Sequence, residues 1–398
     1  MRILLWAALL LASAPMAAAD YPENAELREQ AWDAADASDY AQSFKLYKQL
    51  ADQGDPAGFV GLAASYLNGQ GVKENDKVGV EWMKKATDLG YPSAFTGMAL
   101  AYESGEGLPK DQAKANALFR QAAEKGDPRG AYLVGMNHIE GRGLEKDPAL
   151  AIPWIRKSAE AGYSEAMFQL GLQLARGEGI EKDGLSALGW YTKAASQNHS
   201  ASEFALGAAH EFAADVVENR EIAVYWYRRS SDHGYVDAHN SLAQAYLYGE
   251  GVEKNVTTAL ALYEKGAEGN DPYAQANLGR ILIEGKHRAA DAKRGRALLQ
   301  SAADQNLAWA MTELGLAMAM GDGGKVDLAG AAKQFQQAAD AGDARGMRLL
   351  AQSYADGSGV GRDNAQAKKW YLKAIAAGDP DAKAELQALV AAEKGGKP

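Results

Sequence analysis

Histidines and carboxylates are the residues of this chain whose types and spacing could support chemistry. Four of the six histidines lie between residues 199 and 239, where they could form a metal site or a pH sensor. They are His199, His210, His233 and His239. A row of carboxylates and amides recurs every 36 residues and could be read as a series of metal ligands. Its members are Asn75, Asp111, Asp147, Asp183, Asn219, Asn255, Asp291, Asp327 and Asp363.

Signatures of catalysis are missing from the sequence. It contains no Gly-x-Ser-x-Gly elbow, no phosphate-binding Gly-x-x-x-x-Gly-Lys-Ser/Thr loop and no complete His-Glu-x-x-His motif. His210-Glu211 begins the last of these, but residue 214 is Ala. We therefore expect no catalytic residues, no cofactor and no metal, and interpret the protein as non-enzymatic.

The elements that position these residues form a repeat. The stretch GDARGMRLLAQSYADGSGVGRDNAQAKKWYLKAIAA begins at Gly342, and the same pattern begins at residues 54, 90, 126, 162, 198, 234, 270 and 306, and in part at 378. A period of this size indicates an array of stacked supersecondary units. With each start counted as place 1, apolar or small residues recur at places 5, 9, 10 and 13 and again at places 26, 29, 30 and 33. Both spacings are typical of amphipathic helices, here called helix A and helix B.

The carboxylate row falls at place 22, directly before each helix B. Because Asp and Asn are strong N-caps, we predict that these side chains cap helices and do not bind metal. Proline at place 3 suits the opening of helix A, as at Pro56, Pro92, Pro128, Pro272 and Pro380. His138 and His210 occupy place 13, which is usually Tyr, and His199 and His233 fall in turns between repeats. A structural role is therefore favoured over a metal role for the histidines.

The Leu-Gly/Ala-x-x-Tyr…Gly-x-Gly-Val…Asp…Ala-x-x-Trp-Tyr-x-Lys-Ala-Ala pattern resembles the sel-one-like repeat family, relatives of the tetratricopeptide repeats, over residues 54–394. The resemblance implies an all-α, right-handed α-solenoid of nine helix-turn-helix repeats that acts as an adaptor in protein complexes. Some cysteine-rich members have been described as penicillin-binding or β-lactamase proteins. That chemistry usually needs Ser-x-x-Lys, which is absent here together with all cysteine.

Four segments are expected along the chain. Residues 1–19 are typical of a secretory signal peptide, with Arg2, an apolar stretch and an A-x-A site that ends at Ala19. Residues 20–53 are expected to form N-terminal capping helices, 54–377 the nine repeats, and 378–398 a C-terminal capping helix (Asp381 to Glu393) with a flexible tail. An exported chain without cysteine fits a Gram-negative periplasm, although secretion is also open.

Three turns depart from the pattern, at residues 212–218, 286–288 and 321–327. They could be functional loops or drifted copies of the regular turn. We favour drift, because a turn needs only some permissive sequence.

The face of helix A opposite its core stripe carries places 4, 7, 11 and 15. In a solenoid this face lines the concave groove, where polar residues would be expected if the groove bound nothing. Large apolar residues occur there instead, which indicates an interaction surface. They are Tyr132, Phe168 and Phe204 at place 7, Met136 and Leu172 at place 11, Tyr273 and Trp309 at place 4, and Phe212 and Tyr248 at place 15. The alternative is that tight curvature packs them between neighbouring helices A.

Net charge and composition limit the classes of partner that the protein could bind. The formal charge is −10 and no basic stripe with interleaved aromatics is present, so neither nucleic acid nor an anionic membrane surface is expected. We predict an exported adaptor that binds a protein or peptide in its groove, with repeats three to six favoured. The alternatives are a protein that binds or hydrolyses cell-wall glycan, through acidic pairs such as Glu140 and Glu178, and a self-assembling structural element.

Overall fold

The computed structural model describes residues 22–212, 217–285 and 289–395 of the chain. These residues form one short 3-10 helix, η1 (Pro22–Asn24), and 21 α-helices, and they contain no β-strand. They divide into two compact units, and the division falls between Ser202 and Glu203 inside one helix, α12 (Ser200–Phe212). The predicted signal peptide and two of the irregular turn segments, 213–216 and 286–288, lie outside the described residues.

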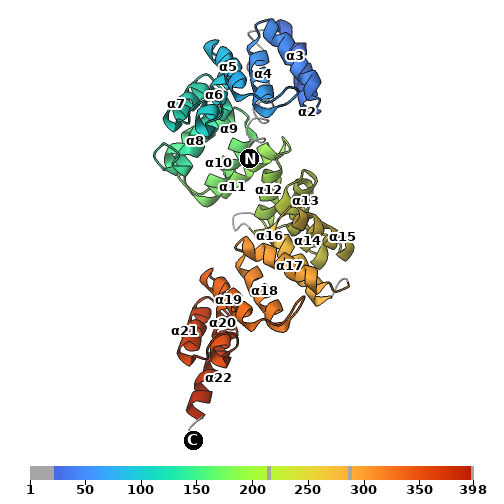
Figure 1. The fold of residues 1–398 in the computed structure, drawn as a ribbon, viewed down its shortest axis with the longest axis vertical. Coiled ribbons are helices and arrows are strands. Elements are labelled where there is room, and N and C mark those ends of the chain that lie inside the picture. Colours follow the sequence, from blue (N-terminus) through green and yellow to red (C-terminus); the bar gives the residue numbers. More distant parts are fainter. Residues whose placement is uncertain (1–21, 213–216, 286–288, 396–398) are drawn as a thin grey trace. The chain divides into compact units, whose positions relative to one another are not determined.

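The first unit is a series of helix pairs in which each helix packs against the next one in the chain (Figure 1). Its capping pair precedes four repeats, with even numbers for helix A and odd numbers for helix B. The helices are α2 (Ala25–Asp36), α3 (Tyr40–Asp52), α4 (Pro56–Asn68), α5 (Asp76–Asp88), α6 (Pro92–Ser104), α7 (Gln112–Glu124), α8 (Pro128–Glu140), α9 (Pro148–Glu160), α10 (Ser164–Arg176) and α11 (Gly184–Ala195).

The second unit continues the same alternation from α12, and it ends in a helix A that has no helix B after it within the described chain. Helices A of successive repeats also touch one another, as α14 does α16 and α16 does α18. The helices are α13 (Arg220–Asp232), α14 (Val236–Tyr248), α15 (Val256–Glu268), α16 (Pro272–Glu284), α17 (Ala292–Asp304), α18 (Ala308–Met320), α19 (Leu328–Asp340), α20 (Ala344–Asp356), α21 (Asn364–Ala376) and α22 (Ala382–Gly395). The prediction of an all-α solenoid of helix-turn-helix repeats is confirmed.

Every helix B from α3 to α21 begins with the predicted cap. The Asp183 carboxylate, for example, accepts the backbone N–H of Ser186 at 2.9 Å, and Asn75 accepts that of Val78 in the same way. Among the described residues, no group of three or more His, Asp or Glu side chains could hold a metal ion. Proline is the first residue of α4, α6, α8 and α16, but α22 begins at Ala382, so the predictions that place Pro380 or Asp381 at its opening are wrong by one or two residues.

Each glycine of the Gly-x-Gly turn has its own role, as the last repeat shows. Gly357 ends α20 in the left-handed region, with φ 75°. Gly359 also has positive φ, and a Cβ there would lie 1.9 Å from the carbonyl oxygen of Leu328, in helix B of the preceding repeat. Only glycine satisfies both conditions, so the turn reverses the chain and brings neighbouring repeats into close contact.

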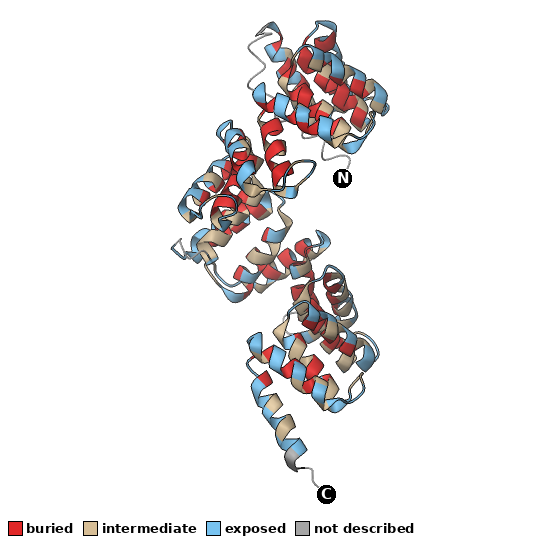
Figure 2. Ribbon diagram, turned by 90° about the vertical axis from the view of Figure 1, so that its left-hand side faces the viewer, coloured by how far each residue is buried: buried red, intermediate tan, exposed pale blue. Residues whose placement is uncertain are grey.

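The core of each unit lies between helix A and helix B. At place 10 of helix A a glycine or alanine receives the large side chain at place 30 of helix B. In α10 a Cβ on Gly171 would lie 2.4 Å from the ring of Tyr191. Figure 2 shows the resulting rows of buried residues along the helices of each unit and the mostly exposed and intermediate residues of α22. In α22 place 10 is the exposed Gln387, which would block the same packing and so suits a capping helix.

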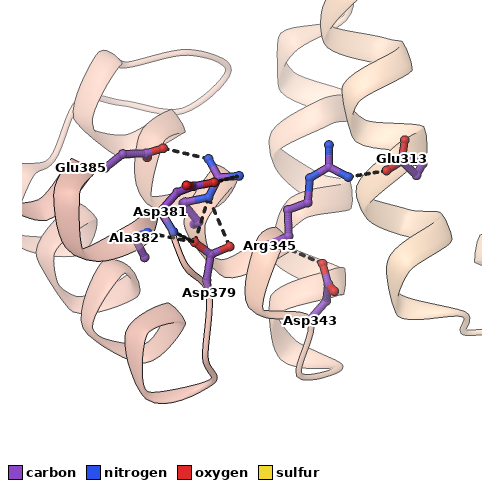
Figure 3. Close-up of polar contacts among 9 residues, drawn as sticks. Glu313, Asp343, Arg345, Asp379, Asp381, Ala382 and Glu385 are labelled. Carbon is purple, nitrogen blue, oxygen red and sulfur yellow. Dashed lines mark hydrogen bonds and ion pairs between the residues drawn. The ribbon is translucent and has the colours of Figure 1, made fainter. Parts of the chain in front are cut away.

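Buried ion pairs attach both terminal elements. Near the start, Arg28 donates to Asp55 at 2.9 Å, and both side chains are almost completely buried. Near the end, Arg348 of α20 contacts Asp379 at 3.0 Å and Glu385 of α22 at 2.8 Å (Figure 3). Breaking such a pair would leave a charge buried without its partner, which is costly. These contacts therefore attach α2 and α22 to the repeats beside them.

Candidate interaction surface

Residues 31 positions apart join each repeat to the next. Place 7 of one helix A meets place 2 of the following repeat, and we call these two residues a seam pair. Some pairs are polar: Thr96 donates to Asp127 at 2.5 Å, and Thr312 donates to Asp343 at 2.6 Å. Others are aromatic, with ring centroids 5.2 to 5.4 Å apart: Tyr132 with Tyr163, Phe168 with His199, and Phe204 with Tyr235.

The residue at place 2 decides which kind of seam pair forms. An aspartate there also caps its own helix A, as Asp127 does by accepting the N–H of Arg129 at 3.1 Å. Where place 2 is Tyr or Leu, helix A has no side-chain cap and place 7 of the preceding repeat is apolar or aromatic. Those pairs are Val60 with Tyr91, Tyr132 with Tyr163, Phe204 with Tyr235, and Ala276 with Leu307.

The three place-7 aromatics predicted for the groove are seam residues. Tyr132, Phe168 and Phe204 are half-buried. Phe204 also contacts the ring of Tyr227, and burial raises the pKa of Tyr132 to about 12. These contacts match the packing alternative that the sequence left open.

A second set of helix-A positions lies along one side of the helix. Places 4, 8, 11 and 15 lie within about 60° of one another at 100° per residue. We call this set the A-stripe. In the first two repeats most of this stripe is buried, as at Ala57, Gly61 and Leu100. Met136 and Leu172, on the A-stripe of the next two repeats, are half-buried.

The A-stripe of the second unit is open and carries large apolar side chains. Tyr273 is 52% exposed, Tyr248 59%, Met320 68% and Phe212 77%. Trp309 is half-buried, because it packs on the core beside Leu299 and Met311. The structure thus exposes Tyr248, Tyr273 and Phe212 among the predicted groove residues.

Polar contacts tie the A-stripe of one repeat to that of the next. Arg280 bonds to Glu284 at 2.9 Å and lies near the hydroxyl of Tyr248 in the preceding repeat. Arg345 bonds to Glu313 of the preceding repeat at 2.5 Å (Figure 3). These contacts join the A-stripe of α14 to that of α16, and the A-stripe of α18 to that of α20.

Four of the histidines that the structure describes have polar partners within the chain. His233 lies 2.7 Å from the buried carboxylate of Glu203, which also pairs with Arg229 at 2.9 Å. The Nδ1 of His199 contacts Ser202, and that of His138 lies 3.0 Å from the carbonyl oxygen of Glu145. The Nδ1 of His239 lies 3.2 Å from the carbonyl oxygen of Tyr235, whereas the buried Nδ1 of His210 has no hydrogen-bond partner among the described residues.

The acidic pair considered for glycan chemistry consists of two exposed side chains. Glu140 pairs with Arg142 at 2.8 Å, and Glu178 lies 4.0 Å from Arg176. Each carboxylate is therefore engaged by a cation beside its own turn.

Comparison with known proteins identifies the repeats. A family model described as the Sel1 repeat matches ten segments: residues 36–55, 60–91, 95–127, 128–163, 164–199, 200–235, 236–271, 272–307, 310–343 and 344–379. The chain belongs to the Sel1 repeat family. Nine segments coincide with the nine repeats, and the tenth covers part of the N-terminal capping pair. The solenoids of Sel1 repeats are typically scaffolds for protein interaction and not catalysts.

Two solved structures of Sel1-type proteins resemble the chain. A protective antigen of uropathogenic Escherichia coli with the same fold is 30% identical, with a TM-score of 0.72, over 89% of this chain and 76% of that one. A Sel1 repeat protein from Oxalobacter formigenes is 27% identical, with a TM-score of 0.58, over 78% of this chain and 90% of that one. A search of curated proteins found no match.

Proposed function

We propose that this Sel1 repeat protein is a non-enzymatic scaffold that binds a protein partner on the A-stripe of its second unit. The observation that carries this proposal is the exposure of Tyr248, Tyr273 and Met320 on the A-stripes of three successive repeats. Contiguous apolar surface marks interaction sites, and rigid aromatics are favoured anchors within them. The corresponding places 4 and 15 of the first two repeats carry only Ala, Ser and Asn, so they offer no such apolar surface.

The proposed binding surface includes fewer residues than the predicted groove, because the place-7 residues of the groove take part in seam pairs. Each place-7 aromatic packs against the ring at place 2 of the next repeat. The A-stripe residues Tyr248 and Tyr273, in contrast, are more than half exposed. An extended series of helices A suits an extended or helical partner segment.

Photo-crosslinking in cells tests this function. A photoreactive phenylalanine derivative would replace Tyr273, and in a matched control it would replace Tyr225 of helix B, which is equally exposed at 52%. We expect a discrete protein adduct from position 273 and none from position 225. Equal adducts from both positions, or none from position 273, would contradict the proposal.

We further propose that the protein works outside the cytoplasm, in the periplasm, after cleavage behind Ala19. The basis is the sequence of residues 1–19 alone. Among the helices that the structure describes, none has the length and hydropathy needed to cross a bilayer. Fractionation with N-terminal sequencing should give a periplasmic chain that begins at Asp20. An intact N-terminus in the cytosol would contradict it.

A further inference from the structure

The A-stripe of the second unit is acidic as well as apolar. From α14 to α22 its charged residues are six carboxylates and two arginines, with no lysine: Asp237, Glu284, Glu313, Asp356, Asp381, Glu385, Arg280 and Arg345. The negative charge of the whole chain is spread over 398 residues. This face thus has a much higher density of negative charge than the chain as a whole.

The arginines of the stripe are already engaged. Arg280 pairs with Glu284, and Arg345 pairs with Glu313. Asp381 and Glu385 share Arg348, which also holds the buried Asp379, so this group has three carboxylates for one cation (Figure 3). Asp237 and Asp356, both exposed, have no arginine of the stripe left to neutralise them.

The exposed apolar side chains belong to the same stripe as these charges. Tyr248 lies near Arg280 of the next repeat, and Arg280 pairs with Glu284. Tyr273 is on the same helix as Arg280, and Met320 follows on the next helix A. A partner that covers them removes water from the surrounding carboxylates. It must therefore supply cations of its own, since burial of an uncompensated charge is costly.

The first unit provides a comparison within the same chain. Over its four repeats the A-stripe carries Arg129, Glu140, Glu165 and Arg176, which balance in charge. The acidity is therefore a property of the second unit and not of the repeat pattern.

We propose that the segment of the partner that binds the second unit is a basic, apolar stretch of polypeptide. In this segment, Lys or Arg side chains alternate with aliphatic or aromatic ones. Its apolar side chains cover Tyr248, Tyr273 and Met320, and its cations face Asp237, Asp356 and the group around Arg348. This inference rests on the proposed function and adds the chemical class of the partner.

Selection from a library of random 12-residue peptides displayed on phage tests the charge claim. The bait is the purified protein, and parallel baits carry Asp237→Asn with Asp356→Asn, or Tyr273→Ala. A control bait with Glu124→Gln and Glu160→Gln loses the same charge from exposed positions of the first unit. Selected peptides are then synthesised, and their affinity for each bait is measured by fluorescence anisotropy.

We expect the selected peptides to contain more Lys and Arg than the input library. They should bind the double Asn variant roughly three- to tenfold more weakly, as for the loss of two exposed charge pairs. The control bait should bind like the parent, and added salt should weaken binding to the parent.

The other outcomes separate the two claims. Neutral or acidic peptides that are lost on Tyr273→Ala would overturn the basic partner and leave the binding surface standing. Peptides that bind every bait equally, or no enrichment at all, would overturn both.

Discussion

Thr96 donates its hydroxyl to the carboxylate of Asp127 at 2.5 Å, across the boundary between two repeats. Asp127 is also the N-cap of α8, so one buried carboxylate caps this helix and joins it to α6, helix A of the preceding repeat. Apolar or aromatic seam pairs, such as Phe204 with Tyr235, replace this arrangement where place 2 is not acidic. Seam pairs of either kind thus join helix A of one repeat to helix A of the next.

Replacement of Thr96 by Val should destabilise the protein by about 1–3 kcal/mol, because it leaves a buried carboxylate oxygen without its donor. Thr257→Val, on an exposed position of α15, should change the free energy of unfolding by less than about 0.5 kcal/mol. Urea unfolding followed by circular dichroism measures both. Equal effects would show that the hydroxyl contact contributes nothing at the seam.

Gly171 and Gly189 give a matched pair for core packing. A Cβ on Gly171 meets the Tyr191 ring at 2.4 Å, whereas a Cβ on Gly189 in α11 meets nothing within 4 Å. Gly171→Ala should cost about 1–3 kcal/mol from overpacking. Gly189→Ala should stabilise the protein by about 0.5–1 kcal/mol through helix propensity. Thermal unfolding of the two variants checks the opposite signs, and a shift of the same sign in both would contradict the packing described.

The caps at place 22 distinguish a structural from a metal-binding role. Asp183→Ala should cost about 1 kcal/mol, because the Ser186 N–H loses its acceptor. Asp183→Asn should cost much less, since Asn75, Asn219 and Asn255 already cap their helices in this protein. Urea unfolding with and without EDTA measures this. The capping role would be contradicted if Asp183→Asn destabilised the protein as much as Asp183→Ala, and if EDTA lowered the free energy of unfolding of the parent protein by a similar amount.

Alkaline pH should lower the free energy of unfolding through Tyr91, a buried residue of a seam pair. Burial raises the pKa of Tyr91 to about 12, from an ordinary value near 10. Between these values the folded state keeps a proton that the unfolded state has lost, so stability falls as pH rises from 10 to 12, by up to about 2–3 kcal/mol for this residue. Tyr91→Phe should reduce the loss between pH 9 and 12. Tyr273→Phe, at an exposed position, should not, and an identical slope in both variants would refute the assignment.

The fold could be predicted from sequence because each element carries a local signal that repeats every 36 residues. Asp363 before α21, the paired Gly357 and Gly359, and the small residue Ala351 at place 10 each have one structural explanation. The sequence places the start of α22 one or two residues too early, because Pro380 and Asp381 are both residue types that suit the first turn of a helix.

The surface was harder to predict because helical periodicity alone does not show which neighbour covers a side chain. Place 7 lies at the edge of the outward face, and the seam to place 2 decides that Phe168 packs on His199. A signal for this existed in the 31-residue pairing of Thr96 with Asp127 and of Tyr132 with Tyr163. Exposure also differs between repeats at the same place: at place 4, Ala57 is 6% exposed and Tyr273 is 52% exposed.

The affinity of the second unit for its crosslinked partner tests the account most directly. Calorimetric titration of that partner into the parent protein, Tyr273→Ala and Tyr225→Ala compares an A-stripe aromatic with an equally exposed helix-B aromatic. We predict that Tyr273→Ala weakens binding at least tenfold, or about 1.4 kcal/mol, and that Tyr225→Ala binds like the parent. Unchanged affinity for Tyr273→Ala, or equal losses in both variants, would contradict the assignment of the A-stripe as the binding surface.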